Sequence, residues 1–153
     1  MHRMPRNGFT FIELLIAMAV LAILFVMVFV TVHSVQQKGQ NIRVRSDVRQ
    51  LRLLAEEVFD NAGANYVSWT TNPLTVNQVK SLRNDIDVAN SLAPGPNSTS
   101  VVIDTRENQY CVSGQLHAPE NGAGFVCVDA TGVFHDTHAQ CADVGQASLV
   151  CPQ

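Results

Sequence analysis

The chain divides into a strongly apolar first segment and a longer segment of mixed polarity. From Phe9 to Val32 the sequence is almost continuously apolar, and Glu13 is its one charged residue. A helix rises about 1.5 Å per residue, so this segment extends roughly 36 Å, enough to cross a hydrocarbon core of about 30 Å. The apolar region of an ordinary secretory signal is only about 7–15 residues long. The pattern therefore predicts a membrane-spanning helix over residues 9–32.

Beyond this segment the apolar positions follow the period of an amphipathic helix. They recur at alternating steps of four and three, which predicts one buried face and one exposed face. Gly63 favours the end of this helix. Gly39 lies inside it and is either a tolerated surface glycine or a hinge between the two halves. The apolar stripe comprises Val44, Val48, Leu51, Leu54, Ala55, Val58, Phe59 and Ala62.

The remaining residues predict a short helix and a small antiparallel sheet. Helical spacing over Leu74–Asp87 predicts the helix, with Thr75 as its N-cap. Turns at Arg106–Asn108 and Pro119–Gly122 separate runs that read as strands. These strands are Ser100–Asp104, Gln109–Leu116 and Gly124–Asp129.

The cysteines gather at the C-terminal end, at Cys111, Cys127, Cys141 and Cys151. An even number in a small region predicts disulfides and an oxidising compartment. A turn centred near Pro119 places Cys111 opposite Cys127, so we prefer that pair, with Cys141 and Cys151 closing a C-terminal loop. The other two connectivities stay open. The fold class is α+β, with a long N-terminal helix and a small disulfide-bonded antiparallel sheet as its head.

The carboxylate of Glu13 raises the free energy of placing this segment in a membrane. A carboxylate at the centre of a membrane helix costs about 2.5–3.5 kcal/mol on insertion scales. Either Glu13 lies near the cytoplasmic boundary and reaches water, or it is retained for a cationic partner in an assembly. A free α-amino group would be such a partner if the chain were cut just upstream.

The junction before the apolar segment resembles the processing site of type IV prepilins and pseudopilins. A leader with Arg3 and Arg6 is followed by the run Gly8-Phe9-Thr10-Phe11-Ile12-Glu13-Leu14-Leu15. Asn7 stands where that family usually has a basic residue. The resemblance implies that a prepilin peptidase/N-methyltransferase cuts after Gly8 and methylates Phe9. It also implies that Glu13 pairs with the N-terminal amine of a neighbouring subunit.

A second resemblance lies in the C-terminal strands. The sheet of certain bacterial pilins is similar to Tyr110-Cys111-Val112-Ser113 and to Phe125-Val126-Cys127-Val128-Asp129-Ala130-Thr131-Gly132. This similarity favours a pilin over a type II secretion pseudopilin, which typically lacks this cysteine pattern.

The expected organisation follows from these features. We expect a leader over 1–8, a transmembrane and filament-core helix over 9–32, an amphipathic half over 33–62 and a head over 63–153. The resemblance implies a single-pass protein of the inner (cytoplasmic) membrane that later enters an extracellular filament. Its partners would be the peptidase, other copies of itself or related pilins, and a pilus assembly platform.

A simple count of the Lys and Arg residues near the span argues against an orientation with the C-terminal part outside the cytoplasm. The positive-inside rule places Lys and Arg on the cytoplasmic side, yet most of those near the span follow it. They are Lys38, Arg43, Arg45, Arg49 and Arg52. We give more weight to the cysteines and the leader than to this count.

Other chemistries are weaker interpretations. The net charge of −3, with no basic patch among aromatic residues, does not indicate a nucleic-acid surface. His135, His138 and Cys141 are spaced as metal ligands can be, but extracellular cysteines favour disulfides. Calcium binding is equally conceivable, but its candidate ligands match no loop motif and are typical of solvated loop residues. These candidates are Asp129, Asp136 and Asp143. We expect no metal and no cofactor.

One nucleophile–base proximity occurs in the C-terminal part, between Ser113 or Cys111 and His117. No nucleophile elbow or oxyanion motif surrounds these residues, so we expect no enzyme activity.

Three functions remain in order of preference. The first is a structural subunit of a type IV pilus-like filament. The second is a minor pilin or a type II secretion pseudopilin. The third is a secreted binding domain released by cleavage after Ser34.

Overall fold

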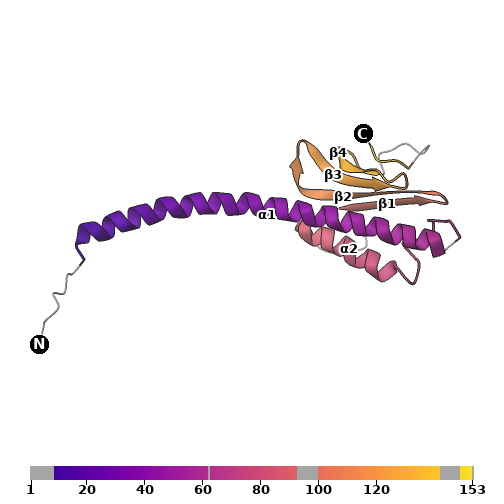
Figure 1. Ribbon diagram of the computed structural model, residues 1–153, viewed down its shortest axis with the longest axis horizontal. Helices are drawn as coiled ribbons and strands as arrows, with labels where there is room; N and C mark the ends of the chain where they lie inside the picture. Colours follow the sequence, from indigo (N-terminus) through magenta and orange to yellow (C-terminus); the bar gives the residue numbers. More distant parts are fainter. Residues whose placement is uncertain (1–8, 62, 93–99, 142–148, 153) are drawn as a thin grey trace, which may run out of the picture. The chain divides into compact units, whose positions relative to one another are not determined.

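The computed structural model describes residues 9–61, 63–92, 100–141 and 149–152, without the side chains of Val30, Thr31 and His33. The chain forms two compact units, Met1–Gln36 and Gln37–Gln153. Helix α1 (Phe11–Asn61) has residues in both, and the other elements belong to the second unit (Figure 1). These are α2 (Val76–Ala89), β1 (Val101–Arg106), β2 (Gln109–Glu120), β3 (Ala123–Asp129) and β4 (Phe134–Thr137).

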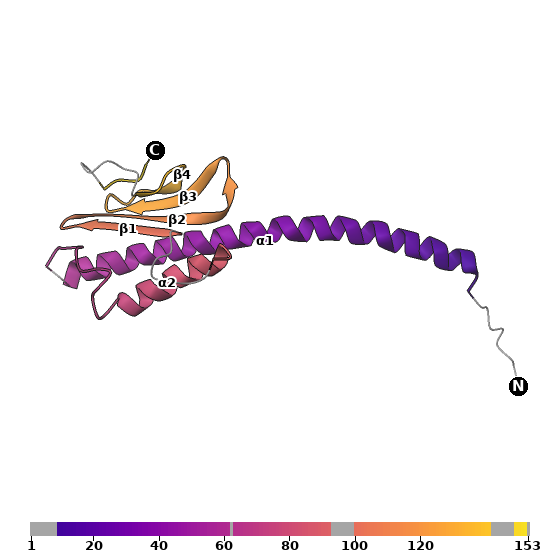
Figure 2. The same ribbon diagram turned by 180° about the vertical axis from the view of Figure 1, so that it is seen from behind.

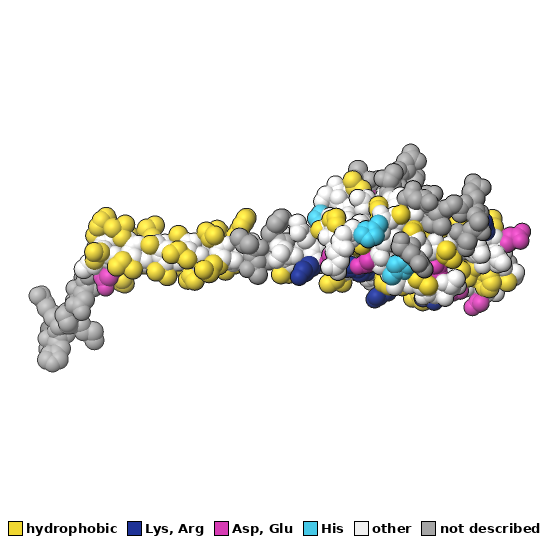
Figure 3. Space-filling view, turned by 90° about the horizontal axis from the view of Figure 1, so that it is seen from above, with side chains coloured by type: hydrophobic (Ala, Val, Ile, Leu, Met, Phe, Trp, Pro, Cys, Tyr) yellow, Lys and Arg dark blue, Asp and Glu magenta, His cyan; other side chains and the backbone are white. Residues whose placement is uncertain are grey.

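The first unit contributes the apolar part of α1. Every side chain described between Phe9 and Gln36 is exposed, and apolar side chains cover this part of the helix on the face shown in Figure 3. The helix is long and apolar enough to cross a membrane. A helix that is apolar all round and has no cover from its own fold requires lipid or other chains as its surroundings.

The second half of α1 confirms the predicted amphipathic stripe. In the second unit it lies between the sheet and α2 (Figures 1 and 2). Leu54 and Phe59 are partly buried, and Ala62 lies outside the described residues. The remaining members of the stripe are at most 2% exposed: Val44, Val48, Leu51, Ala55 and Val58.

Gly63 ends α1 as predicted. Its φ of +72° is left-handed, and the amide of Ala64 donates to the carbonyl of Phe59 at 3.0 Å. This is the six-to-one hydrogen bond of a Schellman motif, in which glycine avoids the steric penalty of positive φ.

The described strands form one antiparallel sheet in the order β1-β2-β3-β4, which confirms the predicted meander. Strand β4 was not expected, because its four residues include the polar His135 and Asp136 and read as a loop. Pairing with β3, with Cys127 opposite His135, makes it a strand. Tertiary pairing has therefore overridden a weak local pattern.

The Thr75 prediction is correct in position and wrong in role. Thr75 occupies the N-cap position of α2, but its side chain makes no capping bond. Its buried hydroxyl donates instead to the carbonyl of Trp69 at 2.9 Å, which fixes the loop that precedes the helix.

The turn between β2 and β3 is tighter and later than predicted. Strand β2 continues to Glu120, and Asn121 and Gly122 form a two-residue turn with φ of +53° and +85°. Both values are those of a type I′ turn, for which Asn-Gly is the preferred sequence. The dipeptide was therefore a stronger signal than Pro119.

The core of the second unit joins α1, α2 and the sheet through one set of buried residues. Trp69, Tyr110 and Ile86 are fully buried, and Tyr110 meets Tyr66 and Trp69 edge-on at ring distances of 4.8 and 5.5 Å. The hydroxyls of both tyrosines donate to the Glu56 carboxylate of α1, each at 3.1 Å. Their polar ends are thus satisfied, as buried tyrosines require.

Gly114 marks the closest approach of β2 to α1. A Cβ at this position would lie 2.7 Å from Cγ2 of Val48 and 3.3 Å from Cγ1 of Val44. We expect Gly114→Ala to lower the free energy of unfolding by about 1–3 kcal/mol, because the core must move to admit a methyl group. Thermal melting of the full chain in detergent micelles measures the effect.

Gly124→Ala is the matched control. It also adds a methyl group to a strand glycine, but no atom lies within 4 Å of the new Cβ. Equal melting temperatures for the two variants would contradict the close-approach account.

Candidate processing and assembly site

The start of α1 is built around Thr10 and Glu13. The amide and the hydroxyl of Thr10 both donate to Oε2 of Glu13, each at 3.0 Å, and the Glu13 amide donates to the Thr10 hydroxyl at 3.4 Å. This reciprocal arrangement is a capping box, which satisfies helix amides that lack an intrahelical partner. The Thr-x-x-Glu signal is in the sequence and could have predicted this capping box, in addition to the charge of Glu13.

The expected processing site also includes Gly8 and Phe9. Phe9 precedes the helix and is 87% exposed. Gly8 and the rest of the leader, residues 1–8, lie outside the described residues. Within the described part of the chain the hydrogen bonds of Glu13 use Oε2, which leaves Oε1 available to a second partner.

The disulfides correct the preferred pairing. Cys111 is bonded to Cys141 and Cys127 to Cys151, with Cα–Cα distances of 5.8 and 5.7 Å. The preferred Cys111–Cys127 pair is therefore wrong, and so is Cys141–Cys151. All four half-cystines are buried.

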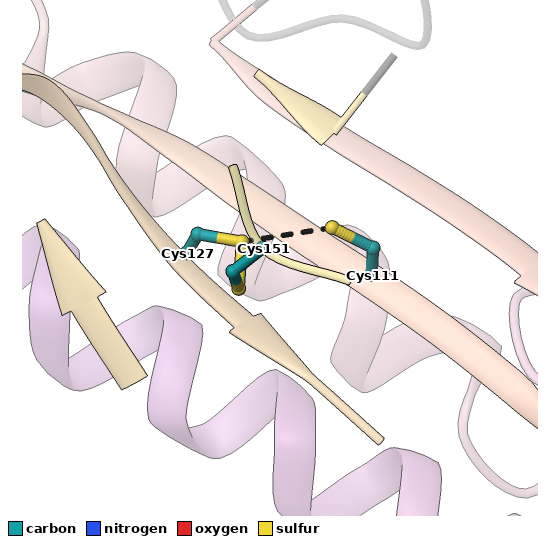
Figure 4. Close-up of side chains that lie close together, drawn as sticks. All are labelled: Cys111, Cys127 and Cys151. Atoms are coloured by element: carbon teal, nitrogen blue, oxygen red, sulfur yellow. Dashed lines mark hydrogen bonds between the residues drawn. A yellow bond between two sulfur atoms is a disulfide. The ribbon is translucent and has the colours of Figure 1, made fainter. Parts of the chain in front are cut away.

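The strand register explains the error. Cys127 lies opposite Ser113, and Cys111 lies opposite Asp129. The assumed turn centre was displaced, and the ladder shifts register again between Gln115 and Glu120. Cys111 and Cys127 are consequently diagonal neighbours, with their sulfurs 3.5 Å apart (Figure 4). Each is free to pair with a cysteine from the C-terminal residues.

The residues that the sequence offered as a weak metal-site alternative, His135, His138 and Cys141, form no such cluster within the described residues. Cys111, Cys127 and Cys151 bring their sulfurs within 4.8 Å of one another, but disulfide-bonded sulfurs offer no thiolate to a metal. His135 contacts the carbonyl of Pro152 through Nε2, and His138 contacts that of Gly122 through Nδ1.

The acids considered as an alternative calcium site have other partners where the structure describes them. Asp129 accepts hydrogen bonds from the amides of Thr131 and Cys151. Asp136 binds Arg45, and Asp143 lies outside the described residues.

Ser113 holds the C-terminal residues against the sheet. Its buried hydroxyl accepts a hydrogen bond from the amide of Cys141 at 3.1 Å. Cys111, the other candidate nucleophile beside His117, is consumed in a disulfide.

Arg45 and Asn41 form a polar clamp between α1 and the sheet, which no local sequence pattern predicts. Arg45 donates to both carboxylate oxygens of Asp136, at 3.1 and 2.7 Å, and to Glu120 at 2.7 Å. Asn41 pairs with both the amide and the carbonyl of Ala118 and also donates to Glu120. Hydrogen bonds from Asn41 and Arg45 hold the pKa of Glu120 below its usual range.

Other cations that follow the span also contact the second unit. Arg43 pairs with Asp85 at 2.9 Å, Arg49 stacks on Phe134 at 4.3 Å, and Arg52 donates to the carbonyl of Gly132. Together with Arg45, these cations serve the packing of the second unit. Four of the five cations that follow the span therefore have partners within the fold.

Comparison with known proteins identifies the class of the N-terminal segment. Residues 3–29 match the family described as the prokaryotic N-terminal methylation motif. This match supports a type IV pilin-like or pseudopilin-like protein, a class that is generally structural, and it implies processing by a prepilin peptidase and a membrane-associated assembly system. Neither the comparison with curated proteins nor that with solved structures finds a match.

The disulfide pairing can be measured in a non-reduced digest. Cleavage after Glu and before Asp separates the four cysteines into residues 108–120, 121–128, 136–142 and 143–153. We expect mass spectrometry to find 108–120 linked to 136–142, and 121–128 linked to 143–153. A link between 108–120 and 121–128 would restore the pairing favoured by the sequence.

Proposed function

We propose that this chain is a structural subunit of a type IV pilus-like filament. A prepilin peptidase/N-methyltransferase would cut after Gly8 and methylate Phe9, and an assembly platform would polymerise the chain through α1. One observation carries the proposal. The methylation motif coincides with a helical segment whose described apolar side chains the chain's own fold leaves exposed.

The parts of the chain then have distinct roles. Residues 1–8 are the leader, 9–32 serve as membrane span and filament core, and 33–62 carry the head formed by 63–153. The buried disulfides support a head outside the cytoplasm, because such bonds persist in oxidising compartments. The chain would be a single-pass protein of the inner membrane before assembly and part of an extracellular filament afterwards.

Glu13 has two tasks in this proposal. Through Oε2 it caps its own helix. Through Oε1 it would accept the charged N-terminal amine of Phe9 from a neighbouring subunit. Such a pair is stronger in an apolar filament core than in water, because the lower dielectric constant strengthens the attraction. It would also remove the cost of an unpaired carboxylate among apolar side chains.

A minor pilin or a type II secretion pseudopilin is the second candidate, since both carry the same N-terminal motif. The similarity of the cysteine-bearing strands to those of certain pilins favours a pilin. Native-length filaments composed chiefly of this chain would support a major pilin, and filaments containing it only in trace amounts would support the second candidate.

Release as a secreted domain after Ser34 has less support. Helix α1 runs through Ser34, so a signal peptidase would have to cut inside a helix. N-terminal mass spectrometry of the mature chain distinguishes this release from filament assembly. We expect N-methylated Phe9 as the first residue; a chain beginning at Val35 would overturn the filament proposal.

Variants of Glu13 separate its two tasks. We expect Glu13→Ala to enter the membrane normally but to give no filaments. Glutamine can replace glutamate in a capping box but carries no charge, so we expect Glu13→Gln to fail as well. Sheared filaments are counted by electron microscopy and the membrane fraction is measured by immunoblotting. Normal filaments from Glu13→Gln would show that capping, and not charge pairing, is what assembly needs.

A further inference from the structure

Asp47 is a buried carboxylate of α1 in the second unit. The residue is only 6% exposed, and its Oδ2 has no hydrogen-bond partner within the described residues. Burial of a carboxylate disfavours its charged form when no hydrogen bond replaces those that water made. The protonation state of Asp47 therefore affects how firmly the elements around it pack.

The helix period places Asp47 on the face of α1 that packs against α2. Arg43 lies one turn before it and donates to Asp85 of α2 at 2.9 Å. Gln50 and Leu54 follow on the same face and line a hollow together with residues of α2. Positions 43, 47, 50 and 54 make one stripe of a helix. Figures 1 and 2 show α2 beside this half of α1.

Two charged groups act on Asp47 in addition to its burial. Burial, followed by the negative charge of Asp85, raises the pKa of Asp47 to about 6, and the positive charge of Arg43 opposes this rise. Arg43 is already paired with Asp85, and the side chains of that pair are 47% and 45% exposed. Water therefore screens its attraction for Asp47. Within the described residues no charged group of the sheet acts on Asp47.

The direction of the pH effect follows from these surroundings. When α2 moves away, Asp47 meets water, and its pKa returns toward the ordinary value of 3.8. The docked state therefore binds the proton more tightly than the open state does. Docking is then strongest below about pH 4, weakens as the pH rises from about 4 to about 6, and changes little above that range.

We propose that Asp47 makes the docking of α2 on α1 sensitive to pH, so that α2 packs firmly in acidic surroundings and opens more readily at neutral pH. Opening here means a local separation of α2 and not unfolding of the whole unit. It would expose the buried face of α2, which carries Val79, Ile86 and Ala89. This device belongs to the second unit alone and is independent of the proposed function.

The variant Asp47→Asn tests the proposal. Asparagine has the shape of a protonated aspartic acid but does not ionise. Hydrogen exchange of the α2 amides is measured by mass spectrometry, on the full chain in detergent micelles, at about pH 5 and about pH 7.5. At each pH the rate in the unaltered chain is divided by the rate in Asp47→Asn, which cancels the intrinsic pH dependence of exchange.

We expect this ratio to rise about ten-fold from the lower to the higher pH. At the lower pH the docked carboxyl group is still protonated, and at the higher pH it is ionised, because its pKa of about 6 lies between them. Exchange in the unaltered chain should be the faster of the two at both pH values.

Asp60→Asn is the matched control. It removes an exposed carboxylate from the same helix, so its ratio should be the same at both pH values. Circular dichroism shows whether each variant keeps its helices.

Four outcomes would overturn the proposal. The first is a ratio for Asp47→Asn that does not change with pH. The second is an equal rise for Asp60→Asn. The third is faster exchange in Asp47→Asn than in the unaltered chain at the higher pH, which would show that packing uses the charge of Asp47. The fourth is loss of the helices in Asp47→Asn, because asparagine and protonated aspartic acid would then not be equivalent at this position.

Discussion

Close packing of β2 on the second half of α1 is the contact on which the rest of the head depends. Gly114 allows the strand to reach Val44 and Val48, and Ile86 of α2 lies beside the same point. Helix, strand and second helix therefore meet in one place. Because β2 also pairs with β1 and β3, the position of the whole sheet follows from this approach.

Polar contacts then fix how the sheet is oriented on the helix. Asn41 engages β2 beyond the region of regular pairing, and Arg45 reaches both Glu120 and Asp136. At the other end, Glu56 receives the hydroxyls of Tyr66 and Tyr110. An apolar interface alone tolerates sliding, whereas hydrogen bonds to specific atoms permit one alignment.

The sequence predicted the features that depend on local pattern. Periodicity located both helices, alternating runs located three strands, and Gly63 marked the end of α1. The methylation motif was recognisable because residue type, spacing and the apolar tail coincide within one segment.

What the sequence did not predict depends on register and on distant pairing. An error of two residues in the hairpin placed Cys111 opposite Cys127, although Asn121-Gly122 was available as the better turn signal. Strand β4 has too little local preference to be read without its partner β3. The roles of Asn41 and Arg45 required knowing which strand residues they would meet, which no local pattern encodes.

The two disulfides have a mechanical consequence. Each connects a strand of the sheet to the C-terminal residues, so the chain from Cys111 to Cys151 is closed into overlapping covalent loops. Under tension these loops cannot be drawn out, even after their hydrogen bonds break. When the head is pulled, the segment between α1 and Cys111 would extend. The segment closed by the two disulfides would separate from the rest as a single unit.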